Sequence, residues 1–130
     1  MSCISLPEKI YFKQGCLSIA LDELKGTKRA FLIGNSEFVE SKLNELDIQH
    51  ITYSGIPEKC MEEADLFEPD VVIAIGGKAE MQMLALLKDK GVYLVAVPTE
   101  NDIEMCADMV IIDRSDKLPL LELAFEEMFA

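Results

Sequence analysis

The chain has 130 residues, half of them hydrophobic, and a formal net charge of −12 at pH 7. This length and hydrophobic content indicate a single domain with a real core rather than a disordered chain. The negative charge repels nucleic acid and anionic membrane surfaces, so neither is expected as a partner. The apolar stretches are too short to cross a bilayer and the N-terminus lacks a signal-peptide pattern, so we expect a cytoplasmic protein.

Short apolar runs alternate with amphipathic segments along the whole sequence. Buried runs and two edge-type segments predict strands at 8–13, 30–33, 48–53, 71–75, 93–97 and 109–112. Apolar residues at helical spacing predict helices at 16–25, 36–46, 58–67, 81–87 and 118–128. We expect Phe38, Leu43 and Leu46 to face the core from the second helix, and Leu66 and Phe67 from the third. The alternation predicts a three-layer α/β domain.

The candidate site lies in the stretch 68–99. Its first apolar run ends at Gly76 and Gly77, an apolar helical segment follows, and a second run ends at Pro98 and Thr99. Strand, glycine turn, helix and strand form a βαβ unit with a right-handed crossover. Because ligands in such sheets bind beyond the carboxyl ends of the strands, these two turns are where chemistry would occur.

No set of residues predicts catalysis or metal binding. The single histidine, His50, is expected to face solvent from an edge strand, and one imidazole cannot form a metal site. A cysteine nucleophile would need a histidine base, and we expect His50 to lie near a cysteine only by chance. Asp70 and Asp113 stand at strand ends, where turn residues are common. We expect buried free thiols rather than disulfides or metal ligands at the cysteines, which form no CxxC pair. They are Cys3, Cys16, Cys60 and Cys106.

Three segments together resemble a known family. They read PEKIYFKQGCLSIALDELKGTKRAFLIGN, EPDVVIAIGG and VPT. In order and phasing they are similar to the N-terminal, nucleotide-binding domain of iron-containing (group III) alcohol dehydrogenases. The likeness is greatest to the alcohol dehydrogenase half of bifunctional aldehyde-alcohol dehydrogenases. The resemblance implies a Rossmann-like domain with a mostly parallel sheet, of the type shared by dehydroquinate synthase and iron alcohol dehydrogenase N-terminal domains, over residues 1–130.

The resemblance also assigns a cofactor site, though in altered form. In the family, the motifs PDxIIAxGGGSxxDxAK and PTTxGTGSE bind the cofactor's pyrophosphate and line the nucleotide cleft. Here Lys78 replaces the third glycine and Ala79 the serine, while Gln82 and Ala85 replace the aspartate and lysine. Three carboxylates in the second motif should repel phosphate; they are Glu100, Asp102 and Glu104. The vestigial cofactor-binding set is Gly76, Gly77, Lys78, Ala79, Pro98 and Thr99.

Iron in the resembled enzymes is held by one aspartate and three histidines of a separate helical C-terminal domain. We expect that domain to be absent, and His50 alone cannot replace it. The resemblance therefore implies no metal and no catalytic residue, and we do not expect the chain to act as an enzyme. No cofactor is expected, although NAD(P) is possible if the vestigial site works.

Three hypotheses follow. The leading one is a stand-alone, non-catalytic domain that acts through protein association, as a homodimer or with another protein. The apolar segment 118–130 is the candidate contact element, with packing on its own sheet as the equal alternative. The second hypothesis is a nucleotide-binding module, or a subunit that another chain completes into an alcohol dehydrogenase. The third is alcohol dehydrogenation by this chain alone.

Overall fold

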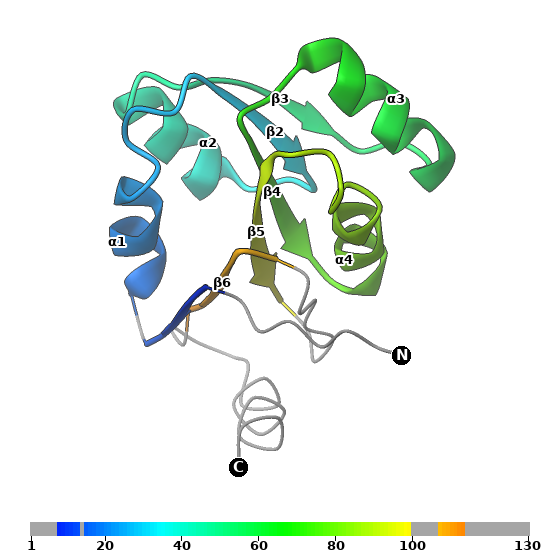
Figure 1. The fold of residues 1–130 in the computed structure, drawn as a ribbon. Coiled ribbons are helices and arrows are strands. Elements are labelled where there is room, and N and C mark those ends of the chain that lie inside the picture. Colours follow the sequence, from blue (N-terminus) through cyan, green and yellow to red (C-terminus); the bar gives the residue numbers. More distant parts are fainter. Residues whose placement is uncertain (1–7, 14, 100–106, 114–130) are drawn as a thin grey trace.

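In the computed structural model, which describes residues 8–13, 15–99 and 107–113, six strands form one parallel sheet. Its order is β1-β6-β5-β4-β2-β3, and every neighbouring pair is parallel. The strands are β1 (Lys9–Phe12), β2 (Arg29–Ile33), β3 (Gln49–Tyr53), β4 (Val71–Gly76), β5 (Tyr93–Pro98) and β6 (Met109–Ile112). The predicted Rossmann-like α/β fold is confirmed (Figure 1).

In the part of the chain that the structure describes, four helices cover the two faces of the sheet. They are α1 (Cys16–Asp22), α2 (Glu37–Glu45), α3 (Pro57–Phe67) and α4 (Lys78–Ala85). Helices α1 and α2 pack on one face, and α3 and α4 pack on the other (Figure 1). Each face has its own buried cluster, because successive residues of β2, β4 and β5 point to opposite sides. The result is the three-layer arrangement predicted from the sequence.

The two central strands β4 and β5 run in register over their full length. Val71 pairs with Tyr93 at one end, and Gly76 pairs with Pro98 at the other. Nearly all of their residues are buried, which explains why the sequence shows continuous apolar runs without polar alternation. This register places the two candidate motifs side by side at the carboxyl ends of adjacent strands.

The phase of two helices differs from the prediction. Phe38 is 52% exposed and Leu66 is 75% exposed, although both were expected to face the core. In α2 the buried pair is Val39 and Leu43, spaced by four residues, so Phe38 falls outside the packed stripe. In α3 the buried positions are spaced by four and three residues, and Leu66 lies beside rather than on that row. Those positions are Cys60, Ala64 and Phe67.

Other elements lie close to their predicted bounds. Helix α1 ends at Asp22 rather than at residue 25, and hydrogen-bonded turns follow it. Strands β1 and β3 form the two edges of the sheet, as expected, and β6 lies between β1 and β5. The predicted helix 118–128 and the segment 100–106 lie outside the described residues. Among the described helices, none has the length and apolar character that crossing a membrane requires.

Candidate functional site

The strand order reverses between the neighbouring strands β2 and β4, because β3 is added on one side of β2 and β4, β5 and β6 on the other. From β2 the chain continues into α2 on one face, whereas from β4 it continues into α4 on the other. The strands are paired up to Ile33 and Ala74, so their carboxyl ends are adjacent. Such a topological switch point opens a crevice between the two departing loops, and it is the usual ligand position in doubly wound sheets.

A glycine at positive φ ends each of these two strands. Gly34 has φ +93° and Gly76 has φ +146°, conformations that L side chains rarely adopt. A Cβ at Gly34 would collide with the backbone oxygen of Ile75 and lie 3.3 Å from Cγ of Glu80. A Cβ at Gly76 would lie 2.5 Å from Oε1 of Glu80. The Glu80 side chain therefore packs against both turns, and its position depends on both residues being glycine.

The carboxylate of Glu80 occupies the amino end of α4. Gly77 is the N-cap of this helix, and its backbone N–H donates to Oε1 of Glu80 at 3.0 Å. The first N–H groups of a helix lack intrahelical partners, and the helix dipole favours an anion beside them. Phosphate groups of nucleotides bind at this kind of position. Here the chain supplies its own anion, in the manner of the glutamate of a capping box.

The structure brings together part of the predicted cofactor set. Thr99 donates its backbone N–H to the carbonyl oxygen of Gly76 at 2.8 Å, which joins the two motifs. Gly76 and Gly77 are half-buried and Pro98 is buried. The remaining side chains of the set, those of Lys78, Ala79 and Thr99, belong to exposed residues. Binding of a cofactor by these residues stays a prediction, and Glu100, Asp102 and Glu104 lie outside the described residues.

Sequence reasoning missed two residues of this crevice. Gly34 directly follows the predicted strand 30–33 and carried no functional prediction, although it mirrors Gly76 across the switch point. Glu80 falls at a variable position of the family motif GGGSxxDxAK, so the motif assigned it no role. Its signal was present in the spacing, because a glutamate three residues after an N-cap is the capping-box position.

Aspartates at the strand ends cap backbone groups. Asp70 accepts hydrogen bonds from the N–H groups of Lys28 and Arg29 at 3.0 and 3.1 Å. Asp113 accepts from the N–H groups of Gly15 and Leu17 at 2.8 and 3.2 Å, and so holds the start of α1. These contacts agree with the expected role of both aspartates as turn residues.

The histidine and the described cysteines form no reactive centre with one another. His50 lies 3.7 Å from Glu40, from Nε2 to Oε1, and its side chain is only 14% exposed, so the prediction that it faces solvent was wrong. Helix α2 covers it, because β3 turns this side chain toward the face on which α2 packs. Cys16 and Cys60 are buried free thiols, as expected, in clusters on opposite faces of the sheet. Burial raises the pKa of the Cys60 thiol to about 11.

The side chains that could ligate a metal are scattered over the described part of the chain. In the described ranges 8–13, 15–99 and 107–113, no three His, Cys, Asp or Glu side chains are grouped closely enough to hold a metal ion. Each of the three lysine salt bridges among the described residues joins one basic and one acidic side chain. The described part of the chain therefore contributes hydrogen-bond caps and ion pairs rather than a metal centre.

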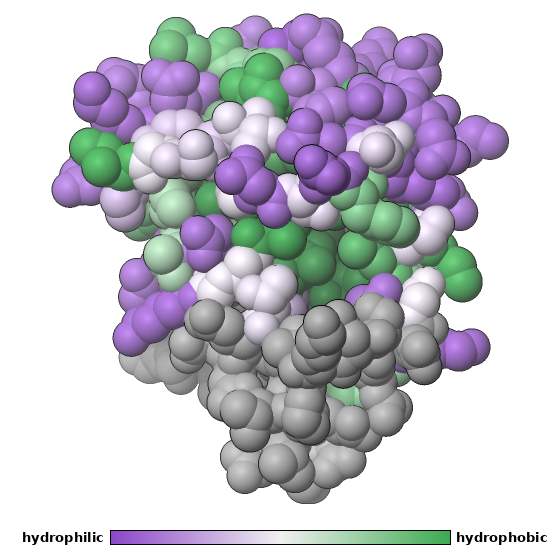
Figure 2. All heavy atoms as spheres, turned by 180° about the vertical axis from the view of Figure 1, so that it is seen from behind, coloured by the Kyte–Doolittle hydropathy of each residue, from purple (hydrophilic) through white to green (hydrophobic). Residues whose placement is uncertain are grey.

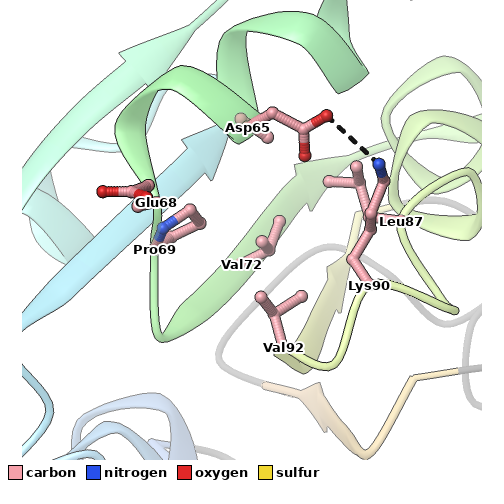
Figure 3. Close-up of a pocket in the computed structure, with 8 residues that line it drawn as sticks. Asp65, Glu68, Pro69, Val72, Leu87, Lys90 and Val92 are labelled. Atoms are coloured by element: carbon pink, nitrogen blue, oxygen red, sulfur yellow. Dashed lines mark hydrogen bonds and ion pairs between the residues drawn. The ribbon is translucent and has the colours of Figure 1, made fainter.

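A hollow of about 280 Å³ opens at the other end of β4 (Figure 3). Val72, Leu87 and Val92 form its apolar floor, and an ion pair of 3.1 Å between Asp65 and Lys90 lies at its rim. Two further hollows adjoin the amino ends of the strands. All three are separated from Gly76 and Gly77 by the length of a strand, so none of them is the predicted nucleotide site.

The fold and the switch point define a Rossmann-like, doubly wound α/β domain, and comparison with known proteins shows which proteins this chain resembles. The aldehyde-alcohol dehydrogenase of Clostridium acetobutylicum is 36% identical over 100 residues, covering 63% of this chain and 12% of that protein. The bifunctional aldehyde-alcohol dehydrogenase of Escherichia coli K12 is 32% identical over 100 residues, covering 63% of this chain and 11% of that protein.

A solved structure agrees with these relatives in fold. The iron-containing alcohol dehydrogenase of Corynebacterium glutamicum superposes with a TM-score of 0.66 at 17% identity, covering 87% of this chain and 42% of that one. No protein-family model matches the chain. The chain is thus similar to the alcohol dehydrogenase region of bifunctional aldehyde-alcohol dehydrogenases, and the resemblance found in the sequence is confirmed. It spans about an eighth of the curated relatives' length.

Proposed function

We propose that this chain is an iron-alcohol-dehydrogenase-like, nucleotide-binding-fold domain that is non-catalytic and acts through protein association. The observation that carries the proposal is the hydrogen bond from the Gly77 N–H to the Glu80 carboxylate. This carboxylate holds the anion position at the amino end of α4, where a pyrophosphate would need to bind. The proposal keeps the single domain, the cytoplasmic location and the absence of bound metal and cofactor that the sequence led us to expect.

Electrostatics support closure of the site. A phosphate entering the crevice must either displace Glu80 or approach its negative charge, and both cost free energy. Two like charges about 4 Å apart repel by about 4 kcal/mol at an effective dielectric constant near 20. Lys78 begins α4 and could offset part of this repulsion, but it is exposed, where a lysine gains little from a single ion pair.

Surface composition supports association. Among the described residues, six large hydrophobic side chains are exposed, and they come from helices, a strand and a loop. They are Ile19, Phe38, Ile51, Ile56, Leu66 and Leu86. Figure 2 shows hydrophobic side chains gathered across the middle of one face, beneath a largely hydrophilic upper part. Apolar surface of this kind often marks a contact with another protein.

A second candidate function is nucleotide binding, as a module or as a subunit of an alcohol dehydrogenase that another chain completes. The crevice geometry favours it, because two glycine turns and a helix N-terminus meet at the switch point. In that case Glu80 would have to swing away when the nucleotide binds. Alcohol oxidation by this chain alone has no such support in the described residues.

Calorimetric titration with NADH, NADPH and ADP distinguishes the two candidates. We expect no saturable heat from the wild-type chain up to millimolar nucleotide. Removing the internal anion in Glu80→Ala should free the Gly77 N–H and permit weak, saturable binding, whereas Glu80→Gln should bind less because its amide oxygen can still accept that N–H. Glu62→Ala, an equal charge change at an exposed position of α3, serves as the matched control.

The opposite result would be equally clear. Micromolar binding of a nicotinamide nucleotide by the wild-type chain, abolished by Gly77→Asp, would overturn the proposed closed site and establish the nucleotide-binding candidate. Hydride transfer from short alcohols to NAD or NADP, assayed with added iron or zinc, would contradict the non-catalytic part of the proposal.

A further inference from the structure

The hollow at the amino end of β4 is an apolar pocket with a polar rim (Figure 3). Its volume of about 280 Å³ is just below the roughly 300–1,000 Å³ of pockets that bind drug-sized molecules, so it suits a smaller ligand. Val72 and Leu87 are buried and form its floor together with Val92. Figure 3 shows Glu68 on one side of this floor and Lys90 on the other, so α3 and the segment after α4 wall the hollow from two sides.

The rim of the hollow offers more hydrogen-bond acceptors than donors. The Asp65 carboxylate accepts from Nζ of Lys90 at 3.1 Å, and Lys90 is the one basic residue among the described residues that line the hollow. The backbone carbonyl of Asp65 lacks the usual helical donor four residues further on, because that residue is Pro69, which has no N–H. The Glu68 carboxylate makes no hydrogen bond or ion pair with any residue that the structure describes. Two carboxylates and a carbonyl therefore share a single ammonium group.

The carboxyl ends of two helices meet at this rim. Helix α3 ends at Phe67, directly before Glu68, and the turns that follow α4 carry Leu87 and Lys90. The carboxyl end of a helix carries partial negative charge, which a basic side chain in the last turn often offsets. Neither α3 nor α4 has a basic residue in its last turn. The helix ends and the carboxylates therefore both favour a positively charged group at the rim.

We propose that this hollow binds a small amphipathic ammonium compound, that is, a primary amine attached to a short apolar body. The body covers the apolar floor, and the ammonium group, which has three N–H donors, donates to the acceptors of Asp65 and Glu68. A carboxylate of the same shape finds one cationic donor, Lys90, which already pairs with Asp65. The hollow lies at the opposite end of β4 from Gly76, so this inference does not depend on the closed crevice of the proposed function.

Amide NMR spectra of the isotope-labelled chain, titrated with hexylammonium chloride at neutral pH, test the site. We expect saturable shifts centred on residues 64–68, 72 and 87–92, with a dissociation constant in the millimolar range. Hexanoate has a similar body and the opposite charge, and methylammonium has the head group without the body. Both should bind at least about tenfold more weakly. Nα-acetyl-lysine amide carries its alkylammonium group on a peptide backbone and should also bind more weakly, because its amides would enter an apolar hollow.

Two substitutions and a control test the groups at the rim. Asp65→Asn should weaken hexylammonium binding about threefold to tenfold and, because it releases Lys90, should strengthen hexanoate binding. Lys90→Gln should strengthen hexylammonium binding about threefold, because it removes the competing ammonium group. Glu62→Gln makes the same charge change as Asp65→Asn at an exposed position of α3 outside the hollow, and it should alter neither affinity. Thermal melting of each variant monitors folding.

Three kinds of result would overturn the inference. Hexylammonium that causes no saturable shift up to tens of millimolar, or shifts centred elsewhere in the chain, would show that the hollow is not a binding site. Equal binding of hexanoate, or unchanged binding in Asp65→Asn, would overturn the cationic class of ligand. Equal binding of Nα-acetyl-lysine amide would assign the hollow to lysine side chains of proteins instead of free amines. The nucleotide titration tests the proposed function separately, because it concerns the other end of the strands.

Discussion

Replacing Gly34 by alanine tests the geometry on which the switch-point crevice depends. Gly34 has φ +93°, and its added Cβ would collide with the backbone oxygen of Ile75, an atom of the neighbouring strand that cannot rotate away. Gly26 offers a matched control, because its φ is +99° and nothing lies within 4 Å of its added Cβ. The two substitutions share the conformational cost and differ in the collision.

The expected loss of stability has two parts, the conformational cost at positive φ and the collision of the added Cβ. A non-glycine residue at positive φ costs about 1–2 kcal/mol, offset by about 0.5–1 kcal/mol because alanine restricts the unfolded chain. We therefore expect Gly26→Ala to lower the free energy of unfolding by about 1 kcal/mol. A forced contact in a packed region adds about 1–3 kcal/mol, so Gly34→Ala should cost roughly 2–4 kcal/mol in total.

Urea unfolding followed by circular dichroism measures both values, and thermal melting should show a loss of roughly 3–5 °C per kcal/mol for a domain of this size. Equal losses of stability in Gly34→Ala and Gly26→Ala would refute the reasoning, because they would show that the Ile75 oxygen does not crowd Gly34. The slope of the urea transition should stay constant, which would confirm that the variants differ in stability alone.

Two further predictions concern the cap of β2 and the buried thiol on the α3 face. Asp70→Ala leaves two backbone N–H groups without their carboxylate and should cost about 1–2 kcal/mol, whereas Asp89→Ala, an equal charge change at an exposed residue, should change stability by less than about 0.5 kcal/mol. Equal losses of unfolding free energy in Asp70→Ala and Asp89→Ala, measured by urea unfolding, would show that the Asp70 carboxylate does not stabilise the start of β2. Burial raises the pKa of Cys60 from 9.0 to about 11, so between these pH values the unfolded chain loses a proton that the native chain keeps, and stability falls as pH rises. The stability advantage of wild type over Cys60→Ala should shrink by about 2–3 kcal/mol over that window in reductant-containing urea titrations; a constant difference would contradict it.

The sequence alone determined which segments form strands and where the candidate turns lie. Continuous apolar runs such as the one in β4 can be satisfied only by burial on both faces, so their pattern already implies a parallel sheet covered by helices. The spacing of Gly76, Gly77, Pro98 and Thr99 then located both turns, and the comparisons confirmed the similarity to the alcohol dehydrogenase region of bifunctional aldehyde-alcohol dehydrogenases.

Only the tertiary structure decided the strand order and the position of the Glu80 side chain between Gly34 and Gly76. Strand order depends on contacts between residues far apart in the chain, which local periodicity does not encode. The sequence likewise gave no reason to join Gly34 to Gly76, because they are separated by a helix, a strand and another helix before the sheet brings them together. Helix phase was also settled by packing, which buried Val39 and left Phe38 exposed. Folding thus placed the Glu80 carboxylate at the amino end of α4, because the two glycines leave room for that side chain and for no Cβ of their own.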